Sequence, residues 1–396
     1  MQPTLFISIN SIGGNFLRLI RKLLPLFIVL GVIWVIYAKD IQDSKIQMIY
    51  QNITADLESW KENPNIQNAL GFLGVGLDQI FGELNQVITK YRSDPSNPES
   101  PDIEKPRLSE PTSQSFSIHN IELGDTREEV EKLVGEAKRS SMNEYGVNWN
   151  AYHDQYRNFF MIAYDNDNKV AGLYTNQDLI SSKQKIKIGS PKDLVLAQFG
   201  DPLTFLKKGR ISYQVKNDGE YYLYQFEDSY ITIFFDKHKE NTVTAIQIIS
   251  EELENDKSEF YAEGNQSLIE GFEYQLFDLT NSSRVVNRLQ PLTWDDRVKI
   301  TARDHSVDMA VNQYFDHTNI EGQSPFDRME EDNISFQTAG ENIAAGQLSS
   351  IFAHEGLMNS MGHRENILQS NFESLGIGVG FDTEEKPYYT QNFITK

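Results

Sequence analysis

Three short segments in the last third of the chain decide its fold: YFDH at residues 314–317, GENIA at residues 340–344 and MNSMGHRENIL at residues 358–368. Each segment sets a histidine or a glutamate among small or apolar neighbours. Two imidazoles and one carboxylate that converge in a cleft can hold a divalent metal, or can serve a substrate as acid and base. We therefore expect the three segments to meet at one site.

In this order the segments resemble the CAP superfamily of cysteine-rich secretory proteins, antigen 5 and pathogenesis-related proteins, and the bacterial branch most of all. The similarity covers roughly residues 267–395. It implies that residues 267–396 form a three-layer α-β-α sandwich with a central cleft. The superfamily has no agreed enzymatic activity, so the resemblance by itself implies no reaction.

The resemblance also implies which side chains line the cleft. The polar candidates are His305, His317, Glu341, Asn342, Ser360 and His363. Eukaryotic members usually have two histidines and two glutamates in the cavity. His317, Glu341 and His363 fill three of these positions, and the fourth falls near Ser360, which is not acidic.

The missing carboxylate weakens an acid–base pair built from two glutamates, but a metal site needs only three protein ligands and water. His317, Glu341 and His363 are thus candidate ligands for zinc or another divalent cation. A hydrogen-bonded structural cluster and a catalytic site remain alternatives. His305 shares one helix face with Val298 and Met309, so we expect it to be a hydrogen-bonded core histidine.

Composition limits the classes of function. A length of 396 residues predicts two or three domains, and the net charge of −21 argues against a nucleic-acid partner. The chain has no cysteine, which excludes disulfides, thiolate metal sites, a cysteine nucleophile and an acylated lipoprotein anchor. The sequence also has no phosphate-binding loop, dinucleotide fingerprint or His-Glu-x-x-His helix.

The beginning of the sequence predicts export. Arg18, Arg21 and Lys22 precede an uncharged run over residues 23–38, and acidic residues follow it. This asymmetry predicts that residues 1–40 are a signal-anchor, with the N-terminus inside and the body outside the cell. A signal peptide cleaved after Ala38 would instead secrete the protein, and a buried core helix is the third alternative.

Residues 41–92 are expected to form a helical stalk. From Leu70 to Tyr91 the apolar residues recur in steps of three and four, which is a heptad pattern. This seam predicts a helix packed on its own chain, a homodimer through Leu70–Tyr91, or a helix lying on the membrane. Residues 93–115 are rich in proline, serine and acidic residues, and we expect a disordered linker.

An internal repeat follows over residues 116–250. IELGDT at residues 121–126 returns as IKIGSP at residues 186–191, and each copy continues into a predicted helix and aromatic strands. We expect a duplicated α+β domain, which resembles the CAP-associated N-terminal domain of Gram-positive bacteria. A second linker at residues 251–266 should leave few apolar contacts between this domain and the C-terminal domain.

The sequence thus predicts an α+β protein with a membrane helix, a stalk, a duplicated domain and a CAP sandwich. We expect it at the Gram-positive cell membrane, facing outside, or secreted after cleavage. Its cleft is expected to bind an envelope ligand without catalysis. A metal-assisted hydrolase of envelope peptide or glycan, and a structural envelope or spore protein, are the alternatives.

Overall fold

The structure is a computed structural model, and it describes residues 105–208, 210–215 and 219–396, which belong to one compact unit. The expected membrane segment, the stalk with its Leu70–Tyr91 seam, and the linker up to residue 104 lie outside the described residues. No helix in the described ranges combines the length and the apolar character that crossing a bilayer requires.

Both copies of the repeat contribute to a single antiparallel sheet of seven strands. Its order is β2 (Arg139–Met142), β3 (Asn148–Asp154), β4 (Arg157–Tyr164), β5 (Val170–Thr175), β11 (Thr242–Ser250), β10 (Ser229–Asp236) and β9 (Tyr221–Phe226). The copies meet where β5 pairs with β11, with Thr175 opposite Ile246. The two modules are therefore joined edge to edge through backbone hydrogen bonds.

The repeated sequence forms the same turn twice. Gly124 and Gly189 adopt φ values of +92° and +83°, which favour glycine because a Cβ atom is disfavoured there. Each donates its N–H to a strand of its own copy, Gly124 to Val170 O and Gly189 to Val243 O, at 2.8 Å in both cases. The first helix of each copy follows directly, α5 (Arg127–Val134) and α6 (Lys192–Phe199).

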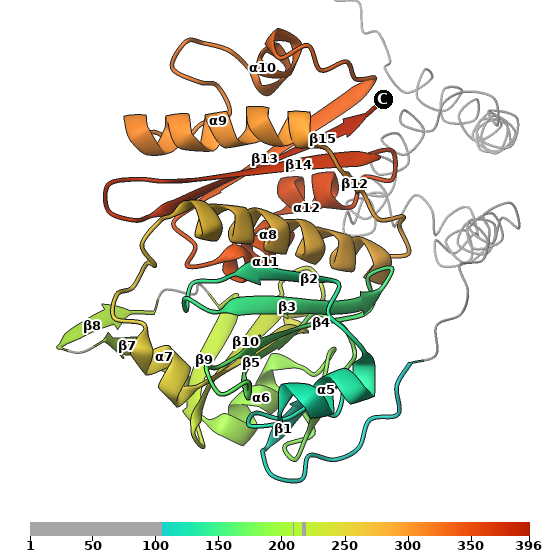
Figure 1. Cartoon of the computed structure of the whole chain (residues 1–396), viewed down its shortest axis with the longest axis vertical. Helices are drawn as coiled ribbons and strands as arrows, with labels where there is room; N and C mark the ends of the chain where they lie inside the picture. The colour runs from blue at the N-terminus through green and yellow to red at the C-terminus, as the bar shows by residue number, and fades with distance from the viewer. Residues whose placement is uncertain (1–104, 209, 216–218) are drawn as a thin grey trace, which may run out of the picture. The chain divides into compact units, whose positions relative to one another are not determined.

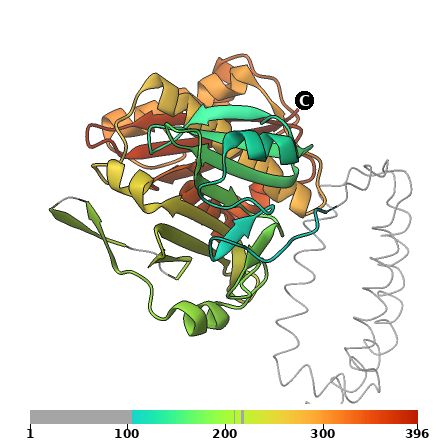
Figure 2. The same ribbon diagram turned by 60° about the horizontal axis from the view of Figure 1, so that its bottom comes forward.

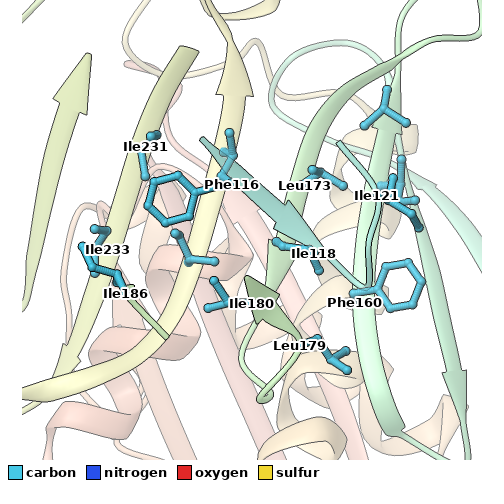
Figure 3. Close-up of a cluster of buried hydrophobic side chains, with 14 of the residues drawn as sticks. Phe116, Ile118, Ile121, Phe160, Leu173, Leu179, Ile180, Ile186, Ile231 and Ile233 are labelled. Carbon is cyan, nitrogen blue, oxygen red and sulfur yellow. The ribbon is translucent and has the colours of Figure 1, made fainter. Parts of the chain in front are cut away.

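Smaller elements complete this half. β1 (Phe116–Ile118) pairs with β6 (Ile180–Ser182), and β7 (Phe205–Lys208) pairs with β8 (Ile211–Gln214) in a hairpin that projects from the body (Figures 1 and 2). β1, α5 and α6 cover one face of the large sheet with a cluster of buried aliphatic and aromatic side chains, including Phe116, Ile118 and Phe160 (Figure 3).

The segments that were expected to be linkers contain ordered structure within the described range. The Glu122 carboxylate accepts hydrogen bonds from the backbone N–H groups of Thr112, Ser113 and Gln114, which anchors the end of the 93–115 segment. Within 251–266, residues Glu251–Asp256 form α7, whose Leu253 is buried. These local contacts explain why proline- and acid-rich sequence there still has a defined path.

The C-terminal half is the three-layer sandwich that the resemblance implies. Its elements are α8 (Gln266–Val286), β12 (Thr293–Trp294), α9 (Asp296–Asn312), α10 (Pro325–Glu331), β13 (Thr338–Ala345), α11 (Ser350–Asn359), α12 (Met361–Ile367), β14 (Ser374–Phe381) and β15 (Pro387–Thr395). The sheet order is β12-β14-β15-β13. α9 and α10 lie on one face of this sheet, and α8, α11 and α12 lie on the other (Figure 1).

Alternating glycines in β14 explain how closely α9 approaches the sheet. A Cβ atom at Gly376 would lie 2.2 Å from Lys299 N, and one at Gly378 would lie 2.0 Å from Arg303 N. The intervening residues Leu375, Ile377 and Val379 are buried in the core with α8 on the opposite face. The period-two pattern of the strand therefore separates a backbone contact from a side-chain core.

The helical layer of α8 and α11 is shared, because the seven-stranded sheet packs on it from the other side (Figure 1). One continuous core contains Trp149 and Phe159 of the repeat sheet together with Leu279 of α8 and Ile351 of α11. The expectation of few apolar contacts between the two halves is therefore wrong. The sequence did not predict this core, because the apolar residues that form it lie in helices and strands far apart along the chain. The acidic stretch between the two halves suggested a separation instead.

Candidate functional site

The candidate residues come from three elements around one edge of the CAP sheet. His317 lies in the loop after α9, Glu341 lies on β13, and His363 lies in α12. α12 contacts β13, and α10 contacts both β13 and α9, so the fold brings these elements together. The structure places His317 in contact with Glu341, at 2.9 Å between Nδ1 and Oε1, and it places α12, which carries His363, against β13.

Glu341 forms the centre of the site. Its side chain is almost fully buried, and its Oε1 lies 2.9 Å from His317 Nδ1. Its Oε2 accepts a hydrogen bond of 2.7 Å from Arg328 Nη2. Arg328, on α10, also donates through Nη1 to His317 O at 2.8 Å and to Gln323 O at 3.0 Å. Both carboxylate oxygens are thus engaged by nitrogen donors, and one arginine holds the loop and the strand together.

The pKa values of the two imidazoles are shifted in opposite directions. The hydrogen bond that His317 Nδ1 donates to Glu341 raises the pKa of His317, whose side chain is 49 % exposed. Burial, followed by repulsion from the positive charge of His317, lowers the pKa of His363. His317 therefore keeps its charge to higher pH than an ordinary histidine, whereas His363 loses its charge at lower pH.

Asn342 ties β13 to α12 from inside the protein. It is fully buried, and its Nδ2 donates to His363 O at 3.0 Å and to Gln391 Oε1 at 3.1 Å. Asn366 donates from Nδ2 to Asn342 Oδ1 at 2.9 Å and to Glu341 O at 3.2 Å. Asn342 therefore fixes the backbone that carries the site.

The remaining two candidates occupy supporting positions. His305 is buried in α9, as expected, and its Nε2 lies 3.0 Å from Asp316 O, next to His317. This bond holds the loop that presents His317. Ser360 lies between α11 and α12, and its side chain makes no capping hydrogen bond to α12. His305 thus supports the site by holding this loop, and Ser360 is the residue directly before the helix that carries His363.

The arrangement does not fit the expected metal site. Zinc needs free carboxylate and imidazole lone pairs, but both oxygens of Glu341 already face donors, and one donor is a cationic arginine. In the described part of the chain, no three His, Cys, Asp or Glu side chains are grouped so that they could hold a metal ion. A metal held by Glu341 Oε1 and His317 Nδ1 would have to replace the hydrogen bond between these two atoms, beside the positive charge of Arg328.

Sequence reasoning missed three residues of this network. Arg328, Asn366 and Gln391 all bond to Glu341 or to its neighbour Asn342. Asn366 could have been identified from the sequence, because it belongs to the MNSMGHRENIL segment at residues 358–368. Arg328 lies in a capped segment, SPFDRM at residues 324–329, with no distinctive signature of its own.

Two family models match the chain in succession. The CAP-associated N-terminal domain matches residues 123–260, and the cysteine-rich secretory protein family, or CAP, matches residues 277–393. Among curated relatives, the uncharacterized membrane protein YlbC of Bacillus subtilis is 30 % identical over 319 residues, which cover 73 % of this chain and 86 % of the relative. YkwD of the same organism is 42 % identical over 130 residues, 33 % of this chain and 49 % of the relative.

Two solved structures share the fold of the described unit. An extracellular protein with an SCP domain from Bacillus anthracis superposes with a TM-score of 0.61 and 27 % identity, over 74 % of this chain and 100 % of that chain. A cysteine-rich secretory protein from Staphylococcus aureus has a TM-score of 0.55 and 16 % identity, over 69 % of this chain and 94 % of that chain.

Proposed function

Because this chain belongs to the CAP family of cysteine-rich secretory proteins, with a CAP-associated domain before the CAP domain, we propose that it is a membrane-anchored protein of a Gram-positive envelope whose CAP cleft binds a ligand without turning it over. The name of YlbC as a membrane protein and the extracellular character of the Bacillus anthracis protein support this location. The positive residues before the uncharged run at residues 23–38 support an outward-facing body.

The observation that carries the proposal is the double engagement of Glu341. A general base must reach the proton that it abstracts, but the Glu341 side chain is only 2 % exposed, and its two oxygens face the protein donors His317 and Arg328. The carboxylate therefore orients its two partners. Glu341 neutralises the buried Arg328, which leaves the half-exposed His317 with the net positive charge of the site when it is protonated.

This charge pattern favours an anionic group on the ligand. The pKa of His317 is raised by its hydrogen bond to Glu341, so its charged form persists to higher pH than that of a free histidine. A carboxylate or phosphate at His317 would form a charge-assisted hydrogen bond at an exposed position. Affinity for such a group should be highest at low pH and should fall as pH rises through the His317 pKa.

The repeat domain has the role of a scaffold for this cleft. Arg364, the neighbour of His363, donates to Asp236 of β10 at 3.0 Å. Asn359, the neighbour of Ser360, accepts from Lys237 N and donates to Phe235 O, both at 2.9 Å. The end of β10 thus holds the α11–α12 junction from the repeat side, which limits movement of the cleft edge.

The test is binding of acetate, inorganic phosphate and acidic envelope fragments, followed by the side-chain NMR signals of His317 and His363. We expect saturable shifts at pH 6 that weaken at pH 8 and are lost in His317→Gln. His119→Asn is the matched control, because His119 lies in the repeat domain and has a φ of +54°, which asparagine tolerates.

The rival functions give different outcomes. Zinc binding would weaken as pH falls, since neutral imidazoles are the metal-competent form. Cleavage of an envelope peptide or glycan that is abolished by Glu341→Gln would replace the binding proposal with the hydrolase. If no probe shifts either histidine at any pH, the cleft is a structural cluster.

A further inference from the structure

The hairpin of β7 and β8 projects from the body, and its charge is opposite to that of the chain (Figures 1 and 2). Residues 202–217 contain Lys207, Lys208, Arg210 and Lys216 and no aspartate or glutamate, whereas the whole chain has a net charge of −21. None of the cleft residues described above belongs to this hairpin. The proposed cleft function therefore does not account for it.

One face of the hairpin is fixed to the body. Leu206 and Lys208 are buried, and Lys208 Nζ forms an ion pair with Glu254 Oε1 of α7 at 2.5 Å. The ring of Tyr213, opposite Leu206 in the strand register, stacks on Phe260 with 4.9 Å between the ring centroids. These contacts hold the two strands against the body, so the other face of the hairpin is turned to solvent.

The outer face and the tip expose both apolar and cationic side chains. Phe205 and Ile211 are 56 % and 54 % exposed, although both are large apolar residues. Lys207 shares the outer face with Phe205, because alternate residues of a strand point to the same side, and both Lys207 and Arg210 are exposed. Within the part of the chain that the structure describes, neither of these two cations forms an ion pair.

We propose that this outer face and the tip of the hairpin contact the anionic surface of a lipid bilayer. Phe205 and Ile211 enter the headgroup region, and Lys207 and Arg210 meet the lipid phosphates, since apolar area and basic charge together drive interfacial binding. The proposal rests on the membrane location proposed above, which keeps the body near a bilayer. The acidic remainder of the chain is repelled by the same surface, so contact through the hairpin orients the body.

Two other occupants explain less of this surface. A soluble polyanion would pair with Lys207 and Arg210 but would leave Phe205 and Ile211 in water. A peptide strand could pair with an outer edge of the two-stranded sheet, but main-chain pairing does not use the two cations. A bilayer with anionic headgroups matches both kinds of side chain.

The experiment uses the absence of cysteine from the chain. Ser212→Cys, at the exposed position opposite Lys207, is labelled with nitrobenzoxadiazole in the full-length chain. The chain is incorporated into nanodiscs of phosphatidylcholine alone or of an equal mixture with phosphatidylglycerol. In the mixed discs we expect blue-shifted emission and quenching by lipids brominated on their acyl chains, and both effects should be weaker in phosphatidylcholine. The same label at Glu136→Cys, in the repeat domain, should show neither effect.

Substitutions separate the contribution of charge from that of apolar contact. A basic residue near an anionic surface contributes about 1 kcal/mol, which is a factor of about five in the contact equilibrium. The Lys207→Gln, Arg210→Gln double variant should therefore weaken contact about 25-fold, and Phe205→Ser should weaken it further. The matched control, Lys132→Gln with Lys138→Gln, removes the same charge from exposed positions of the repeat domain and should leave contact unchanged.

The readouts distinguish failure of this proposal from failure of the membrane anchor. Co-elution of the chain with the discs tests the anchor, whereas quenching of the Ser212→Cys label tests the hairpin. A chain that co-elutes without quenching refutes the hairpin contact alone. For a chain that does not co-elute, the same label is read with added vesicles of the mixed lipid, and the same criterion applies. The hairpin proposal also fails if the two double variants behave alike, or if soluble polyphosphate shifts the label as lipid does.

Discussion

Tyr174 and Glu355 lie 181 residues apart in the sequence and form a buried hydrogen bond in which the phenol O–H donates to Glu355 Oε1 at 2.8 Å. Tyr174 belongs to β5 of the repeat sheet, and Glu355 belongs to α11 of the CAP domain. Burial raises the pKa of Glu355 to about 7. The two domains therefore share an interior in which a carboxyl group resists ionisation.

The first prediction follows from this raised pKa. Between the unfolded pKa and about 7 the folded state binds more protons than the unfolded state, so the stability contributed by the neutral form is present at pH 4.5 and is lost as pH rises to 7. Glu355→Gln removes this loss and keeps an acceptor for Tyr174. We expect it to raise the free energy of unfolding by about 2 kcal/mol at pH 8 and to have little effect at pH 4.5.

Urea unfolding of both forms across this pH range measures the difference. Glu136→Gln is the control, because Glu136 is exposed. An equal effect of Glu355→Gln at both pH values would mean that the pKa of Glu355 is the same in the folded and unfolded states.

The second prediction concerns cooperativity between the domains. Residues 105–396 contain one tryptophan in each half, Trp149 on β3 and Trp294 on β12. Because Ile351 is fully buried in the core that joins the halves, Ile351→Ala should cost about 2–5 kcal/mol. In fluorotryptophan-labelled protein, the ¹⁹F signals of Trp149 and Trp294 should report the same urea midpoint of unfolding, and Ile351→Ala should lower that midpoint equally for both. Separate midpoints for the two signals would show that the halves unfold independently.

The third prediction tests the Arg328–Glu341 pair. Both side chains are buried, so Arg328→Leu leaves an unpaired carboxylate and should cost about 3–5 kcal/mol. The Arg328→Leu, Glu341→Leu double variant should recover much of this loss, because neither charge remains buried. A double variant that is as unstable as the sum of the two single variants would indicate that the pair contributes no coupling energy.

The fourth prediction concerns the histidine pair. The pKa of His317 should lie above 6.5 and that of His363 below it. Glu341→Gln should lower the His317 pKa, since the charged hydrogen-bond partner is lost. His317→Gln should raise the His363 pKa, because the repelling charge is gone. NMR titration of the ring signals measures both pKa values in the wild type and in each variant. If neither substitution changes a histidine pKa, the two imidazoles are coupled neither to Glu341 nor to each other.

The fifth prediction addresses topology, and it uses the absence of cysteine from the chain. A single cysteine introduced at Glu136 should react with a membrane-impermeant maleimide on intact cells, since this position belongs to the exposed body. A single cysteine at Gln2 should react only after lysis. The reverse pattern would put the body in the cytoplasm and would end the export proposal.

Much of the fold could be predicted because its signals are local. The Gly124 and Gly189 turns repeat a short motif, and the glycine-alternating β14 has a strict period of two. The same holds for His317, Glu341 and His363, which the family motifs carry. The sequence did not predict that the two repeats form one sheet, because the pairing of β5 with β11 depends on which strand edges meet in space.

The sequence by itself determined the CAP sandwich, the duplicated domain and the choice of His317 and Glu341 as partners, since these depend on short motifs and periodic patterns. Only the tertiary structure decided which hydrogen-bond partners and which charge states these residues have. Arg328 reaches Glu341 across a loop, and Tyr174 reaches Glu355 across a domain boundary. Burial then sets the charge of each group, and burial is a property of the packed interior that no single segment contains.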